Sequence, residues 1–85
     1  MFKVTITVSE GSGAGYGYPP HIYIGGTGIA MSKSVKSAIR KASELAEIKK
    51  GKSAVRQGLD KNTSLIPVWF EKRIEKDGKM ISQTF

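Results

Sequence analysis

The sequence contains no cysteine and only one histidine, His21, in 85 residues. The absence of cysteine excludes disulfides and thiolate metal sites, and a single histidine excludes a His-rich cluster within one chain. No apolar run is long enough to span a bilayer, and the N-terminus alternates polar and apolar residues, unlike a signal peptide. We therefore expect a cytoplasmic protein that has no metal or cofactor and does not contact a membrane.

The sequence also has no recognisable catalytic arrangement. Its carboxylates are scattered among predicted turns and strand surfaces, and His21 has no nucleophile or acid at a suggestive spacing. A chain of this size forms one domain, 1–85, which buries roughly 60% of the surface of its unfolded chain and has little room for an enclosed cofactor. These features predict a protein that is not an enzyme.

Negative charge is scarce. The chain has 14 Lys and Arg against 7 Asp and Glu, a formal net charge of +7. Apart from Lys3, every Lys and Arg lies between Lys33 and Lys79, whereas residues 4–32 contain one charged residue, Glu10. Such a basic surplus indicates an anionic partner, either nucleic acid or an acidic protein surface.

Apolar residues recur at helical spacing only in residues 32–50, which predicts one amphipathic helix. Its apolar stripe consists of Val35, Ala38, Ile39, Ala42, Leu45 and Ala46. Ser32 is the expected N-cap and Gly51 the expected left-handed C-cap. Beyond Gly51, residues 53–57 are interpreted as one separate helical turn closed by Gly58.

Strict alternation of apolar and polar residues predicts strands at 2–9 and 64–75, with a shorter strand at 21–24. Between the strands at 2–9 and 21–24, residues 10–20 contain four glycines and two prolines, which indicates a loop or a loose hairpin connection. Gly25-Gly26-Thr27-Gly28 is expected to end the short strand in a second glycine loop. Pro67 cannot donate a ladder hydrogen bond, so its end of the strand is expected at a sheet edge or a bulge.

Asp77-Gly78 is the dipeptide of a type I′ turn, so a hairpin is expected there. Its register would pair Lys76 with Lys79, Ile74 with Ile81, Lys72 with Gln83, and Phe70 with Phe85. The order strand, strand, helix, strand, strand predicts an α+β fold, a ββαββ two-layer sandwich in which one helix covers one face of a four-stranded, mostly antiparallel sheet.

The helix surface provides the first candidate site. Lys33, Lys36 and Arg40 lie on one arc opposite the apolar stripe, at the helix end where cations oppose the macrodipole. With Lys41, they are the residues expected to contact phosphates. The alternative interpretation is a solvated face with an Arg40–Glu44 pair at i, i+4.

The second candidate is the sheet face that the helix does not reach. The alternation places Lys3, Thr5, Thr7, His21, Tyr23, Trp69, Arg73, Met80, Ser82 and Thr84 there. Tyr23 and Trp69, with Tyr16 and Tyr18 from the glycine-rich loop, would stack on bases of a single strand, and Lys3 and Arg73 would contact its phosphates. The same face would serve equally well as a homodimer interface between two open sheets.

The third candidate is an anion site where the glycine loop runs into the helix, formed by Gly26, Gly28 and Ser32, because backbone N–H groups at a helix start favour anions. The spacing does not match a Walker A motif. A plain strand-to-helix turn is the alternative, and binding of a small phosphorylated ligand is a further hypothesis.

These features lead to one main functional hypothesis, a small non-enzymatic nucleic-acid-binding domain that uses a basic helix ridge and an open aromatic sheet face. The alternative is a small protein-binding inhibitor or adaptor, of the kind encoded by phages and mobile elements, that blocks an acidic or nucleic-acid-binding surface of a larger protein.

Overall fold

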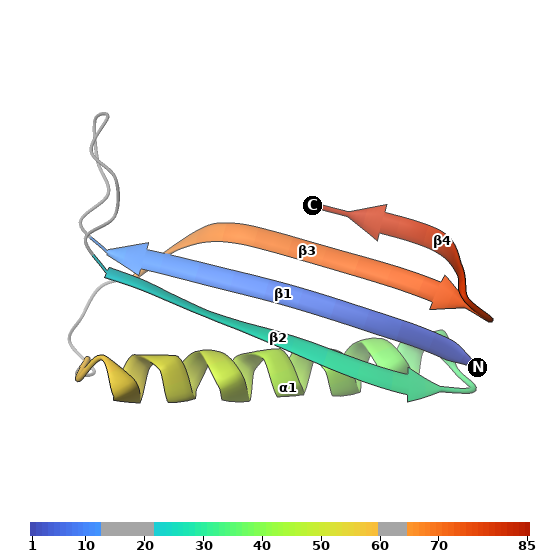
Figure 1. Ribbon diagram of the computed structural model, residues 1–85, viewed down its shortest axis with the longest axis horizontal. Helices are drawn as coiled ribbons and strands as arrows, with labels where there is room; N and C mark the ends of the chain where they lie inside the picture. The colour runs from blue at the N-terminus through green and yellow to red at the C-terminus, as the bar shows by residue number, and fades with distance from the viewer. Residues whose placement is uncertain (13–21, 60–64) are drawn as a thin grey trace.

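The computed structural model describes residues 1–12, 22–59 and 65–85. The elements are β1 (Phe2–Ser12), β2 (Ile22–Ser32), α1 (Val35–Arg56), β3 (Ile66–Lys76) and β4 (Lys79–Thr84). The strands form one sheet in the order β2-β1-β3-β4, and all three pairs are antiparallel (Figure 1). The predicted α+β ββαββ fold is therefore confirmed.

The helix covers only part of one sheet face. α1 packs against β2 and β1, along the edge of the sheet farthest from β4 (Figure 1). The buried core lies between them: Val4, Ile6, Ile24, Ile74, Ala38, Ala42 and Ala46. The helix-facing side of β3 and β4 extends beyond this packed layer.

Small residues bring α1 and β2 into backbone contact. Ala38, Ala42 and Ala46 are fully buried at i, i+4 spacing, and the backbone of Ala42 and Ala46 faces Gly26 and Gly28 on the strand. A Cβ on Gly28 would clash with the Ala42 carbonyl oxygen and lie 2.6 Å from the Ala46 nitrogen. The prediction of a loop at residues 25–28 is therefore wrong, because these glycines admit the helix rather than form a turn.

Both predicted ends of the helix are also wrong. The N-cap is Ser34, whose Oγ accepts a hydrogen bond from the Ser37 N–H at 3.4 Å, while Ser32 belongs to β2. The helix continues through Gly51, which has no neighbouring atom where a side chain would stand. It ends at Gln57, and Gly58 follows with a φ of +70°. The separate turn expected at 53–57 is therefore part of α1.

The first strand is longer than expected. β1 runs to Ser12. Glu10 and Gly11 pair with both β2 and β3, and Ser12 pairs with β2, so the loop predicted from Glu10 begins too early. Pairing on both sides satisfies the backbone despite the glycine at position 11. The rest of that predicted loop, including Tyr16, Tyr18 and the neighbouring His21, lies outside the described residues.

The hairpin turn is confirmed, but the predicted register is not. Asp77 and Gly78 have φ values of 51° and +81°, and Lys76 pairs with Lys79. A bulge beside Ile74 then inserts one extra residue, Ile81, into β4. The observed pairs are Ile74 with Ser82, Arg73 with Gln83, and Lys72 with Thr84. The predicted pairs Ile74–Ile81, Lys72–Gln83 and Phe70–Phe85 are therefore wrong. A one-residue shift exchanges the two faces of a strand.

A second bulge lies between β1 and β3, where Ser9 pairs with Trp69 and Glu10 with Pro67, leaving Val68 as the extra residue. Pro67 also lies on a part of β3 that β4 does not reach, because β4 pairs only with residues 72–76. The prediction that Pro67 marks an edge or a bulge is confirmed.

We call the sheet face turned away from α1 the open face. Its members follow from the register and from the ring contact of Phe85 with Trp69: Lys3, Thr5, Thr7, Ser9, Gly11, Tyr23, Gly25, Thr27, Ile29, Met31, Ile66, Trp69, Glu71, Arg73, Glu75, Met80, Gln83 and Phe85. Ser82 and Thr84, which were expected there, lie on the opposite face because of the bulge in β4.

Candidate nucleic-acid interface

The charged side chains divide unequally between the two sides of the molecule. The open face carries two bases, Lys3 and Arg73, and two acids, Glu71 and Glu75, so its net charge is zero. The other side of the molecule consists of α1, the residues just before it and the sheet face against which α1 packs. We call it the helix side. Eleven bases lie there: Lys33, Lys36, Arg40, Lys41, Lys49, Lys50, Lys52, Arg56, Lys72, Lys76 and Lys79.

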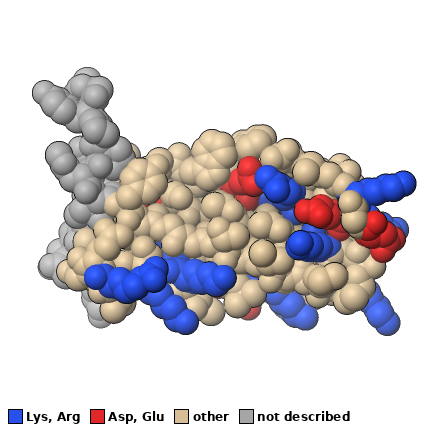
Figure 2. Space-filling view, in the orientation of Figure 1, with Lys and Arg blue, Asp and Glu red and all other residues tan. Residues whose placement is uncertain are grey.

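Among the described residues, four carboxylates oppose these eleven bases: Glu10, Glu44, Glu47 and Asp77, which lies in the turn between Lys76 and Lys79, so the helix side keeps a surplus of seven positive charges. In Figure 1 the strands lie in front of the helix, so Figure 2 presents the open face. Uncharged atoms fill most of that view. Basic side chains lie along its lower edge, over the helix, and at its right-hand end, where acidic side chains lie among them. The basic character of the protein is therefore a property of the helix side.

The predicted phosphate contacts form the first basic cluster, at the start of α1. Lys33, Lys36, Arg40 and Lys41 are all exposed. Among the described residues, no ion pair involves any of the four, so the alternative Arg40–Glu44 pair does not form. Lys36 and Arg40 border a hollow of about 510 Å³ together with Ser34, Ser37 and Ile39. Unpaired cations beside serine hydroxyls are suited to phosphate oxygens.

A second basic cluster, at the end of α1, was not predicted from the sequence. Lys49, Lys52 and Arg56 are exposed, and they border a hollow of about 950 Å³ between the helix and the β2 backbone at Gly25 and Gly26. The apolar wall of this hollow consists of Ile48 and Val55. The prediction missed this cluster because it ended the helix at Lys50, although the spacing of Lys49, Lys52 and Arg56 continues a helical face.

Lys50 is the exception among the bases of α1. Its Nζ lies 2.6 Å from Oε1 of Glu10 on β1 and 2.7 Å from Oε2 of Glu47. Burial of Lys50 favours the neutral amine, but the hydrogen bonds and charges of the two carboxylates outweigh it and raise the pKa of Lys50. Lys50 therefore attaches α1 to β1 and is not available to a ligand.

The predicted stacking residues lie on the other side of the protein. Tyr23 and Trp69 are each about half exposed on the open face. Tyr23 lies on β2 and Trp69 on β3, with β1 between them. The Trp69 ring meets Phe85 edge-on, with centroids 5.4 Å apart. These aromatics and the phosphate contacts of α1 consequently belong to two separate surfaces.

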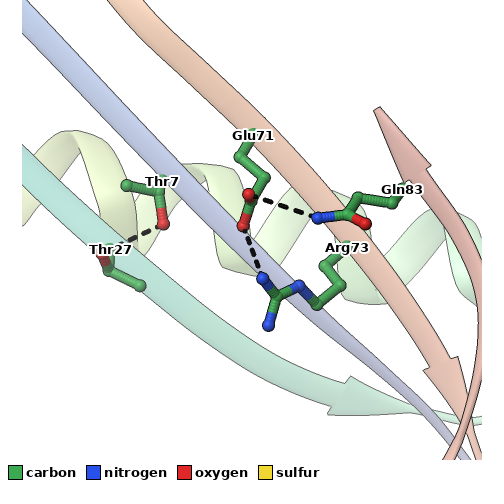
Figure 3. Close-up of polar contacts among 5 residues, drawn as sticks. All are labelled: Thr7, Thr27, Glu71, Arg73 and Gln83. Atoms are coloured by element: carbon green, nitrogen blue, oxygen red, sulfur yellow. Dashed lines mark hydrogen bonds and ion pairs between the residues drawn. The ribbon is translucent and has the colours of Figure 1, made fainter. Parts of the chain in front are cut away.

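Polar groups at the centre of the open face are largely satisfied by one another (Figure 3). Arg73 donates from Nη2 to Oε1 of Glu71 at 3.1 Å, and Gln83 donates from Nε2 to Oε2 of the same carboxylate at 3.4 Å. The hydroxyls of Thr7 and Thr27 lie 3.2 Å apart. Arg73 is thus held in an ion pair, and its buried Nε has no hydrogen-bond partner among the described residues.

The predicted anion site is not assembled. Gly26 and Gly28 lie within β2 and face the backbone of α1, which occupies the space an anion would need. The Oγ of Ser32 accepts a hydrogen bond from the Ser34 N–H at 3.3 Å. Gly26, Gly28 and Ser32 therefore belong to β2 and not to a glycine loop at the start of α1.

A scan of protein-family models and searches of the curated proteins and the solved structures found no match to this chain. Within residues 1–12, 22–59 and 65–85, no group of three potential metal-ligating side chains occurs. No helix among these residues is long and apolar enough to cross a membrane.

Proposed function

We propose that this protein binds the phosphate backbone of double-stranded nucleic acid through the helix side. The observation that supports the proposal is the charge distribution of the described residues, since their positive surplus lies on the helix side and none lies on the open face. Fixed cations that neutralise phosphates release condensed counterions, which drives binding without reference to base sequence.

The geometry of α1 favours a duplex over a single strand. The helix has 22 residues, which gives a length of about 33 Å, close to one turn of a duplex at about 34 Å. Its two exposed basic clusters lie at opposite ends of that length. α1 contains no aromatic residue, so it lacks the platforms on which single-stranded bases stack.

Salt-dependent binding tests this proposal. We expect labelled duplex DNA or RNA to bind with an affinity that falls steeply as salt rises. Lys36→Ala and Lys52→Ala should each lower the slope of log affinity against log salt by about one unit. Lys3→Ala removes an equal charge from the open face and is the matched control, which should leave the slope unchanged. Equal effects of all three variants, or tighter binding to single strands than to duplexes, would contradict the proposal.

A second candidate function is supported by the hollow at the end of α1. Val55 and Ile48 are 77% and 54% exposed there, beside three cations and the free edge of β2. Apolar side chains within a basic rim would suit an acidic segment of another protein, as in an inhibitor or adaptor. A protein complex that survives nuclease digestion and is lost in Val55→Glu would favour this function over nucleic-acid binding.

A further inference from the structure

Large hydrophobic side chains gather on the open face. Tyr23, Ile29, Met31, Trp69, Met80 and Phe85 are each between 48% and 68% exposed. In the part of the chain that the structure describes, the core on the other side of the sheet has four buried hydrophobic residues larger than alanine, Val4, Ile6, Ile24 and Ile74, with Phe2, Val8, Val35 and Ile39 partly buried against it. A small domain with so little buried apolar surface is marginal alone. On the open face these exposed apolar side chains lie on both sides of a polar centre, and such a concentration on an uncovered sheet face marks an interaction surface.

Charge identifies the occupant of this face. Two copies of a chain with a net charge of +7 repel each other, and the repulsion is greatest where two helix sides would meet. The open face has no net charge and contains both signs, Lys3 and Arg73 with Glu71 and Glu75. A two-fold interface places the same patch on both partners, so it requires this kind of self-complementary surface.

The area of the open face is also sufficient. β1, β2 and β3 have eleven residues each and β4 has six, which at usual strand spacing and rise outlines about 600 Å² of flat sheet. Side chains that stand on this footprint raise its accessible area toward the roughly 800 Å² per partner of a standard interface. Its central polar groups already bond to one another, so burial would leave few of them unpaired.

We propose that two copies of this chain form a two-fold homodimer by packing their open faces together. Two sheets stacked at about 10 Å would then form the centre of a four-layer α/β/β/α particle. Trp69, Ile29 and Tyr23 become buried in this arrangement. The dimer does not depend on nucleic-acid binding.

Sedimentation of the full chain over a wide concentration range tests this proposal. We expect a mass of twice 9.2 kDa at high concentration. The dissociation constant of the dimer should fall as salt rises, because salt screens the repulsion between the two positively charged copies. Ile29→Lys, on the open face, should raise the dissociation constant at least 100-fold. Val55→Lys adds the same charge on α1 and should sediment as the unmodified chain does.

Trp69 provides an independent readout, because it is the only tryptophan and lies in the proposed interface. Its emission should shift to the red on dilution over the range in which the mass halves, which decides the question even if Ile29→Lys fails to fold. A 9.2-kDa species at every concentration would overturn the proposal. So would a dimer in which Trp69 stays as open to acrylamide quenching as in the monomer.

Discussion

Gly28 of β2 lies against the carbonyl oxygen of Ala42 on α1, so closely that no side chain fits between the two backbones. Together with Gly26 and the alanines at positions 38, 42 and 46, this contact determines where the helix lies on the sheet. Because the helix sits so close to β2, its flanks are free, and both basic clusters remain accessible.

Gly28→Ala should destabilise the protein by about 1–3 kcal/mol, the usual cost of inserting atoms into a packed site. Gly51→Ala is the matched control, since a methyl group there meets open space within the helix and should stabilise it by about 0.5–1 kcal/mol. Urea unfolding followed by circular dichroism, at one fixed protein concentration, measures both effects. Equal effects of the two substitutions would show that α1 and β2 are not in backbone contact.

The hairpin turn predicts a second pair of effects. Gly78 has a φ of +81°, so Gly78→Ala should cost about 1–2 kcal/mol for placing a side chain in the left-handed region. Asp77→Asn should be nearly neutral, because Asn also tolerates positive φ and the contact of Asp77 with the terminal amine is exposed. Thermal unfolding of the two variants tests this ordering, and a larger loss for Asp77→Asn would be inconsistent with the turn described.

The ion pairs of Lys50 predict a pH effect. Its folded pKa is raised above the ordinary value of 10.5, so the stabilisation is fully present below pH 10.5 and is lost as pH rises through the folded pKa. The loss of this stabilisation lowers the free energy of unfolding above pH 10.5. Lys50→Met, which has no amine to titrate, should lack this contribution to the decline. Lys49→Met, at the exposed neighbouring position, should keep it. Urea titrations between pH 8 and 11.5 compare the three proteins.

The elements that could be predicted from sequence are those with a local signal. Alternation located β1 and β3, and Asp77-Gly78 located the hairpin turn. The glycines of β2 were predicted to form a loop because no local pattern shows that they contact α1, which lies 14 or more residues away in the sequence. Pro67 indicated the bulge in β3, whereas the bulge in β4 has no clear local signal, and each bulge reverses which residues face the open side.

The candidate site could be predicted in part. The helical spacing of Lys36 and Arg40 was enough to place them together on the surface. The zero net charge of the open face could also be predicted from the sequence, because Glu71 and Glu75 alternate with Arg73 along β3. The separation of basic and aromatic residues onto two surfaces depends on the sheet lying between them, so it emerges only from the assembled fold.

The two proposals together predict that the protein bridges two duplexes. A dimer formed through the open faces turns its two helix sides outward in opposite directions, so each can hold a separate duplex. Beads carrying one duplex should then capture a second, labelled duplex only when the protein is present. Ile29→Lys should bind a single duplex as tightly as the unmodified chain yet lose at least tenfold in capture, whereas Lys36→Ala should weaken both steps. Unchanged capture by a monomeric Ile29→Lys would mean that a single copy contacts both duplexes, and would place the two basic clusters of α1 on different nucleic-acid molecules.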